Sequence, residues 1–217
     1  MWVKICGVRD EVAAEGVVHL APDAIGLNFY PKSPRSVSLP VAARIAAIAR
    51  TVQRVGVFVN HPRSQIEDAV AACQLNAVQL HGDESPDFTA HLASVLKDVA
   101  IFRAWRFQGS SLADLADYLA ACRMNGTSVA ACLVDSHVPG VYGGTGAKVP
   151  WAELRREYPM SGWPPLILAG GLSPENIAQA VATVQPWGVD VASGVETAPG
   201  QKDLERVRRF IEAARNA

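Results

Sequence analysis

Eight short runs of aliphatic and β-branched residues recur along the chain, and each is followed by a loop and a segment with helical spacing. These runs predict strands at 2–5, 24–28, 55–59, 77–80, 99–105, 129–134, 166–169 and 189–192. Nearly all of them are continuous apolar runs, which is typical of parallel strands buried on both faces. Eight such strand–helix units favour an α/β fold of the closed (βα)8 TIM barrel type over an open doubly wound sheet.

The intervening segments predict helices at 10–16, 39–50, 64–73, 111–124, 151–158 and 203–214, with two more that start after Ser85 and Ser173. Both serines are predicted N-caps, since a proline follows each of them at the first helical position. We expect Gly16 to end the first helix and Asn125-Gly126 to end the helix at 111–124. No linker or composition break interrupts the chain, so we predict one domain over 1–217.

Composition narrows the class of protein. Of the 217 residues, 49% are hydrophobic and 19% charged, and 20 basic residues against 21 acidic ones give a net charge of −1. Without a basic excess, nucleic acid is not expected as a partner. The first residues enter a strand pattern without a signal peptide, and no apolar run reaches the roughly 18 residues of a membrane span. Four cysteines without C-x-x-C spacing predict a reducing, cytoplasmic location.

Two side chains at predicted strand ends are candidates for chemistry, because the carboxyl ends of barrel strands form the active site. Cys6 follows the first strand and Asp135 follows the sixth. The alternatives are a small buried hydrophobic residue for Cys6 and a turn or helix-cap residue for Asp135. A catalytic Cys6 needs a lowered pKa, but no group that would lower it is evident, and Lys4 would not help if it pointed to the opposite side.

Glycine-rich ends follow the last two strands, at Gly170-Gly171 and Ser193-Gly194. This is where barrels commonly bind phosphate through backbone N–H groups, so we favour phosphate over two tight turns without a ligand. The loop after Asp135 carries a second glycine-rich stretch, at 143–146, which is free to close over a ligand. It lacks the G-K-[ST] ending of a nucleotide-binding loop.

Arg35 and two histidines complete the candidates. Two prolines stiffen the loop that carries Arg35, so its guanidinium could be held as a fork for a carboxylate; a solvated loop arginine is the alternative. His81 and His137 could ligate a metal, but neither has a third partner at suitable spacing, so no metal site is predicted.

In their order and spacing, these segments together resemble phosphoribosylanthranilate isomerases over almost the whole chain. The motifs are Lys-Ile-Cys-Gly at 4–7, Gly-Leu-Asn-Phe-Tyr-Pro-Lys-Ser-Pro-Arg at 26–35, Val-Gly-Val-Phe-Val at 55–59, Gln-Leu-His-Gly at 79–82, Leu-Val-Asp at 133–135, Gly-Gly-Thr-Gly at 143–146, Ala-Gly-Gly-Leu at 169–172 and the stretch 188–203.

The resemblance implies a (βα)8 barrel and an Amadori rearrangement of N-(5-phosphoribosyl)anthranilate in tryptophan biosynthesis, without cofactor or metal. It implies that Cys6 is the general base, Asp135 the general acid and Arg35 the holder of the anthranilate carboxylate. Further substrate-binding residues would be Gln79, His81, Gly144, Gly170, Gly171, Ser193 and Gly194. Such an enzyme binds a small phosphosugar, and we expect a monomer or homodimer. Cys6 must be a thiolate when it acts, so we expect its pKa to be lowered.

The chain departs from the family pattern at two places. Arg103 stands where the family often has a lysine, and Val149-Pro150-Trp151 replaces the usual start of the sixth helix.

Two other interpretations of the function remain. Another phosphosugar barrel, such as a ribulose-phosphate epimerase, would need His and Asp metal ligands on several strands. A non-catalytic phosphoribosyl-binding barrel would tolerate loss of Cys6 or Asp135.

Overall fold

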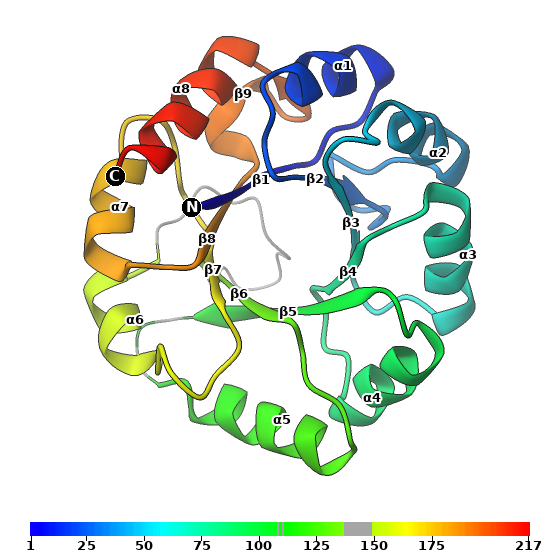
Figure 1. Cartoon of the computed structure of the whole chain (residues 1–217), viewed down its shortest axis with the longest axis vertical. Helices are drawn as coiled ribbons and strands as arrows, with labels where there is room; N and C mark the ends of the chain where they lie inside the picture. The colour runs from blue at the N-terminus through cyan, green and yellow to red at the C-terminus, as the bar shows by residue number, and fades with distance from the viewer. Residues whose placement is uncertain (108, 110, 137–148) are drawn as a thin grey trace.

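Eight parallel strands close into a barrel in the computed structural model, which describes residues 1–107, 109, 111–136 and 149–217 (Figure 1). Each strand pairs with the next along the chain, and β1 pairs with β8. The strands are β1 (Trp2–Cys6), β2 (Ala24–Asn28), β3 (Gln53–Phe58), β4 (Ala77–Leu80), β5 (Ala100–Phe107), β6 (Ala131–Ser136), β7 (Leu166–Leu168) and β8 (Gly188–Val191). The predicted barrel is therefore confirmed.

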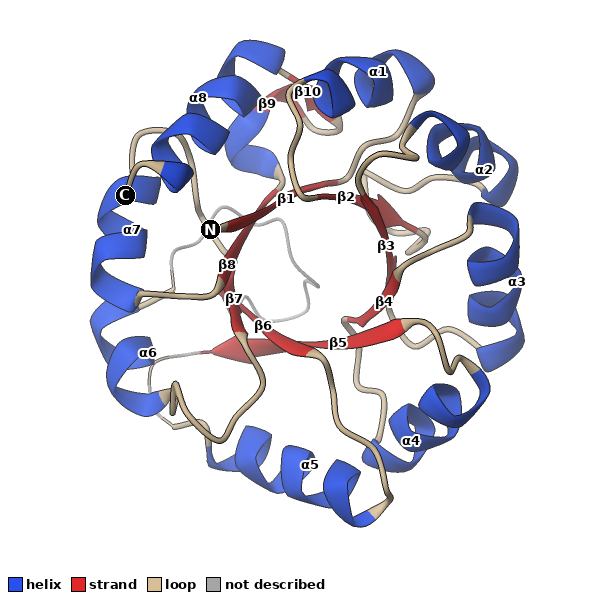
Figure 2. Cartoon of the chain, in the orientation of Figure 1, coloured by secondary structure: helices blue, strands red, loops and turns tan. Residues whose placement is uncertain are grey.

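A ring of helices surrounds the barrel (Figure 2). They are α1 (Glu11–His19), α2 (Leu39–Ile48), α3 (Arg63–Cys73), α4 (Pro86–Val95), α5 (Ala113–Met124), α6 (Trp151–Glu157), α7 (Ile177–Val184) and α8 (Leu204–Arg215). Ser85 caps α4 as predicted, since its Oγ accepts from the Phe88 N–H at 3.1 Å. Pro150 stands at the cap of α6 and supplies no side-chain hydrogen bond. None of the helices in the described part of the chain is both long and apolar enough to cross a membrane.

Side chains alternate across each strand, and this alternation fills two separate cores. Residues facing outward pack under the helices, for example Val3 and Ile5 of β1. Residues facing inward form a second cluster of apolar side chains within the barrel, five of them alanines: Ala24, Val55, Ala77, Phe102, Ala104, Ala131, Leu133, Ile167 and Ala169. The same alternation turns polar residues of β1, β4, β6 and β8 inward toward the carboxyl end of the barrel.

The largest differences from the predicted helix boundaries are at the end of α1 and the start of α7. Gly16 does not end α1, which continues to His19. A Cβ added at Gly16 would lie 2.5 Å from Leu204 Cδ1, so this glycine lets α1 and α8 pack closely. Ser173 is not the cap of α7 either. It starts a turn in which its carbonyl accepts from the N–H groups of Asn176 and Ile177, and the helix begins only at Ile177.

A short segment after β8 has structure that the sequence did not predict. It contains one 3-10 turn, η1 (Ser193–Val195), and an antiparallel hairpin of β9 (Glu196–Ala198) and β10 (Gln201–Lys202). Gly200 turns between the two strands with a φ of 82°. The hairpin matters for the site because it carries Glu196 and Lys202 toward the loop after β2.

Candidate active site

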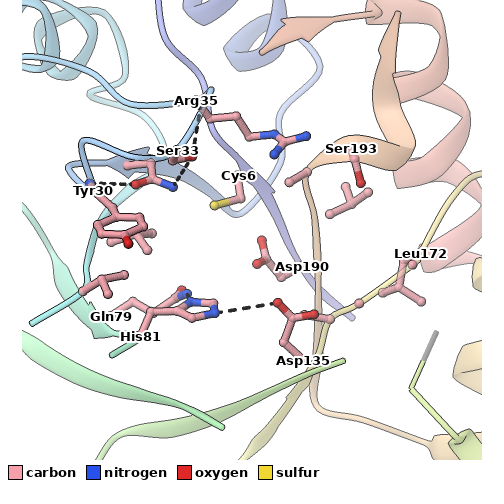
Figure 3. A pocket seen from close by; sticks show the side chains of 18 residues that line it. Cys6, Tyr30, Ser33, Arg35, Gln79, His81, Asp135, Leu172, Asp190 and Ser193 are labelled. Carbon is pink, nitrogen blue, oxygen red and sulfur yellow. Dashed lines mark hydrogen bonds and ion pairs between the residues drawn. The ribbon is translucent and has the colours of Figure 1, made fainter. Parts of the chain in front are cut away.

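One cavity lies at the carboxyl end of the barrel, and it brings together residues from strands far apart in the sequence. Figure 3 shows the side chains of Cys6, Asp135 and Asp190 directed into it. Of the residues predicted from the sequence, those that line it are Cys6, Arg35, Gln79, His81, Asp135, Gly170, Gly171 and Ser193. Gly194 lies next to this lining, while Gly144, the 143–146 loop and His137 lie outside the described residues. The two catalytic candidates thus face one shared space.

Cys6 is the last residue of β1, and Gly26 of β2 makes room for its sulfur. A Cβ at Gly26 would lie only 2.7 Å from Cys6 Sγ. Burial raises the pKa of the Cys6 thiol, and the Asp190 carboxylate adds to this, against the lowering effect of Lys4. The expected low pKa of Cys6 is therefore wrong. Sequence patterns miss this because desolvation at a strand end depends on the whole surrounding barrel.

Lys4 points to the same side as Cys6, because two positions along a strand return a side chain to one face. It is fully buried below the cavity. Its Nζ donates to Gln79 Oε1 at 2.8 Å and lies 3.2 Å from Asp190 Oδ1. Burial works against the charge, but Asp190 and Cys6 outweigh it and raise the pKa of Lys4. A charged amine is thus held within the electrostatic reach of Cys6, which the sequence analysis did not foresee.

Asp190 of β8 is a site residue that the sequence analysis passed over. It lines the cavity, and burial raises the pKa of its carboxyl group even though Lys4 acts to lower it. A signal was available: Asp190 is the one charged residue in the run 189–192, at a position that faces into a barrel. A charge in a strand buried on both faces indicates a paired or functional group.

Asp135 lies on the inner face of β6, opposite a histidine from the end of β4. Its Oδ1 accepts from the Ser136 backbone N–H at 2.7 Å, and its Oδ2 lies 3.7 Å from His81 Nε2 (Figure 3). Gln79 Nε2 in turn lies 2.8 Å from His81 Nδ1. Asp135 is the fifth of six residues in its strand, so it sits within the strand and not just beyond it.

Arg35 is held by an acidic residue from the hairpin. Its Nε and Nη2 donate to the two carboxylate oxygens of Glu196 at 2.8 and 2.7 Å, and Lys202 Nζ lies 2.6 Å from Glu196 Oε1. Burial acts against ionisation of Glu196, but the Arg35 and Lys202 contacts prevail and lower its pKa. Burial also lowers the pKa of Lys202. Arg35 is therefore buried and fixed in orientation, and a solvated loop arginine is excluded.

The glycines after β7 and β8 bring bare backbone to the cavity. Gly170 and Gly171 have φ values of 83° and 64°, which residues with a Cβ rarely adopt. Gly194 approaches the Leu172 carbonyl so closely that an added Cβ would lie 1.8 Å from its oxygen. Gly170 and Gly171 therefore need glycine for their backbone conformation, and Gly194 needs it for space.

Arg103 faces away from the cavity, on the outer side of β5. Its Nη1 donates to Glu84 Oε2 at 2.8 Å, and its Nη2 donates to the Gly82 carbonyl at 3.1 Å. The Tyr118 ring lies 4.8 Å from its guanidinium carbon. Arg103 thus braces the backbone after β4, which carries His81, and does not contribute charge to the cavity directly.

Across the described ranges, no three His, Cys, Asp or Glu side chains gather as a metal-binding group. An epimerase-like site with ligands from several strands therefore has no ligand set in this part of the chain.

Known proteins of one family match this chain over nearly its whole length. The family model for N-(5'phosphoribosyl)anthranilate (PRA) isomerase matches residues 3–213. An N-(5'-phosphoribosyl)anthranilate isomerase from Myxococcus xanthus is 44% identical, covering 99% of this chain and 96% of the relative. One from Trichlorobacter lovleyi is 41% identical, covering 99% and 98%.

A solved structure extends the likeness to three dimensions. It is a phosphoribosyl anthranilate isomerase in complex with reduced 1-(o-carboxyphenylamino)-1-deoxyribulose 5-phosphate. It superposes with a TM-score of 0.80 at 34% identity, over 99% of this chain and 98% of the other. The chain therefore belongs to the N-(5'-phosphoribosyl)anthranilate isomerase family, a family of isomerase enzymes.

Proposed function

We propose that this chain converts N-(5-phosphoribosyl)anthranilate to 1-(2-carboxyphenylamino)-1-deoxyribulose 5-phosphate, an Amadori rearrangement in tryptophan biosynthesis. One observation carries the proposal. A single cavity is lined by a thiol, a carboxyl group, a fixed guanidinium and two glycine ends. These are the groups that an aldose-to-ketose isomerisation of a carboxylated phosphosugar needs.

Asp135 is the proposed general acid. It would protonate the furanose ring oxygen, so that the bond between that oxygen and C1 breaks and a Schiff base forms. The Ser136 N–H already occupies Oδ1 of Asp135, which leaves Oδ2 to carry the transferable proton. His81 lies beside that oxygen, at 3.7 Å from Nε2.

Cys6 is the proposed general base. It would remove the C2 proton of the Schiff base to give an enolamine, which tautomerises to the ketone. Its raised pKa means that the thiol has to lose its proton before it acts, and the buried ammonium of Lys4 favours that loss. The developing positive charge of a bound Schiff base would add a second favourable interaction with the thiolate.

Arg35 and the glycine ends are the proposed anchors of the substrate. The Glu196 pair uses Nε and Nη2 of Arg35, and Nη1 makes no hydrogen bond to any described residue. That remaining donor would meet the anthranilate carboxylate. Backbone at Gly170, Gly171, Ser193 and Gly194 would bind the phosphate, because glycine lets an anion approach N–H groups closely.

The test measures the decrease in fluorescence as freshly generated phosphoribosylanthranilate is consumed. It compares the purified wild-type protein with the variants Cys6→Ala and Asp135→Ala. We expect turnover by the wild type and a loss of about 10²-fold or more in each variant. Cys73→Ala in α3 and the exposed Asp114→Ala in α5 are matched controls that should retain activity.

Three outcomes would contradict the proposal. Binding without turnover would favour a non-catalytic phosphoribosyl-binding barrel. Activity lost on addition of a chelator would favour a metal-dependent epimerase-like enzyme. Full activity in Cys6→Ala or Asp135→Ala would remove that residue from its proposed role while leaving the activity itself in place.

A further inference from the structure

A row of polar contacts crosses the barrel interior between Lys4 and Asp135. Lys4 Nζ donates to Gln79 Oε1 at 2.8 Å, Gln79 Nε2 lies 2.8 Å from His81 Nδ1, and His81 Nε2 lies 3.7 Å from Asp135 Oδ2. All four side chains are buried. The first two contacts take no direct part in the proposed proton transfers.

The contacts have a direction, and Lys4 sets it. An ammonium group only donates hydrogen bonds, so the side-chain atom of Gln79 that faces it must be the carbonyl oxygen. Flipping the amide would place its NH₂ group against the ammonium. Asp190 keeps the ammonium in place, with its Oδ1 3.2 Å from Lys4 Nζ. The Gln79 amide therefore has one orientation, with Nε2 toward His81.

The orientation of the amide then decides where His81 carries its proton. The amide nitrogen of Gln79 only donates, so His81 Nδ1 must accept, and in a neutral imidazole the single N–H is then on Nε2. We propose that Lys4, acting through Gln79, holds neutral His81 in the Nε2–H tautomer and so presents a hydrogen-bond donor to Asp135. Lys4 and Gln79 are then positioning residues.

This tautomer has a consequence for the acid, which rests on the proposed role of Asp135. An Nε2 that already carries a hydrogen cannot take the proton from Asp135 Oδ2, so the proton stays available to the substrate. After the transfer, Nε2–H is a donor directed at the new carboxylate. Among the described residues, His81 Nε2 is buried without a hydrogen-bond partner, as expected for a donor whose acceptor forms during the reaction.

The tautomer is measurable without substrate by long-range ¹H–¹⁵N correlation spectra of protein labelled at histidine. The spectra are recorded at about pH 8, above the ordinary histidine pKa of about 6.5, with His81→Asn to assign the signal. His61 is an internal standard. Its Nδ1 accepts from the Val59 N–H at 3.1 Å and its Nε2 lies 3.1 Å from the Phe29 carbonyl, which requires the Nε2–H form. We expect His81 to give the same pattern as His61.

Gln79→Glu tests the cause. A carboxylate accepts from both Lys4 and His81, so the ring should change to the Nδ1–H tautomer, and kcat should fall by about tenfold or more. Gln53→Glu is the matched control, because Gln53 Oε1 accepts from Trp2 Nε1 at the other end of the barrel and a glutamate oxygen can do the same. The control should leave both the His81 pattern and kcat unchanged.

An Nδ1–H pattern for His81 in the wild type would overturn the inference, whether or not Gln79→Glu folds. An unchanged His81 pattern in a folded Gln79→Glu protein would overturn the role of Gln79. Since the spectra need no substrate, failure of the proposed isomerase activity would leave the tautomer result standing and separate.

Discussion

Replacing Glu196 by glutamine should destabilise the protein strongly, because it removes the counterion of two buried cations. The Glu196 side chain is 3% exposed, that of Lys202 0% and that of Arg35 9%. Glutamine keeps the shape and one oxygen, but it turns an NH₂ group toward a cation and leaves Arg35 and Lys202 without an anion between them. Losing one partner of a buried ion pair costs about 3 to 5 kcal/mol.

We expect the lower end of that range, about 3 kcal/mol, because the amide oxygen of glutamine still accepts one hydrogen bond. For a chain of this length that corresponds to a fall in melting temperature of about 6 to 12 °C. The measurement is thermal unfolding followed by circular dichroism, with urea unfolding for the free energy. Glu175→Gln is the matched control, since it breaks an exposed pair with Arg209 and should leave the melting temperature unchanged.

The difference in unfolding free energy between wild type and Glu196→Gln should decrease as the pH falls. The pKa of Glu196 is lowered in the folded protein from its ordinary 4.5, so its contribution to stability is complete above pH 4.5 and is lost as the pH falls through the folded value. The gap in unfolding free energy between wild type and Glu196→Gln should therefore be widest near neutral pH and shrink in acid. A gap below about 1 kcal/mol at pH 7, or one that grows in acid, would refute the reasoning.

Three further predictions concern the cavity. Gly26→Ala should lower kcat by about 10²-fold, because the new Cβ would lie 2.7 Å from Cys6 Sγ and displace it; unchanged kinetics would mean that the sulfur has room to move. Gly194→Ala should raise KM by about tenfold or more and lower the melting temperature, because the added Cβ would lie 1.8 Å from the Leu172 carbonyl oxygen. An unaltered KM would argue against phosphate binding at this glycine. Alkylation of Cys6 by iodoacetamide, followed by mass spectrometry, should still accelerate above pH 9.0, because burial raises the pKa of this thiol; a plateau reached at neutral pH would contradict that.

The barrel could be predicted because each strand depends on local pattern alone. The apolar run 129–134 is enough to identify β6, which the structure places two residues later, at Ala131–Ser136. The helices follow from spacing and from caps such as Ser85. Boundaries that depend on tertiary contacts could not be predicted. The sequence predicts a helix end at Gly16. The residue lies within α1 instead, where Leu204 packs against it. That 1–217 forms a single domain stays a prediction.

The candidate site was predictable in part for a similar reason. Cys6 and Asp135 lie at or next to strand ends, where barrels place their chemistry, and the structure brings both to one cavity. Lys4 and Asp190 lie within β1 and β8, and in the sequence only a charge at an inward-facing position of an apolar strand indicates them. Glu196 was missed because its function depends on a hairpin whose short strands leave almost no pattern. Gly144 lies outside the described residues.

The barrel interior is divided by side-chain chemistry. Ala24, Ala77, Ala131 and their apolar neighbours form one cluster within the barrel, whereas Lys4 contacts the polar residues Gln79 and Asp190 of the cavity lining. The apolar cluster can therefore maintain the scaffold while the polar lining varies. A laboratory selection for a different phosphosugar should accumulate its adaptive substitutions among the polar residues that line the cavity, and libraries confined to them should yield folded proteins more often than libraries spread over the whole interior.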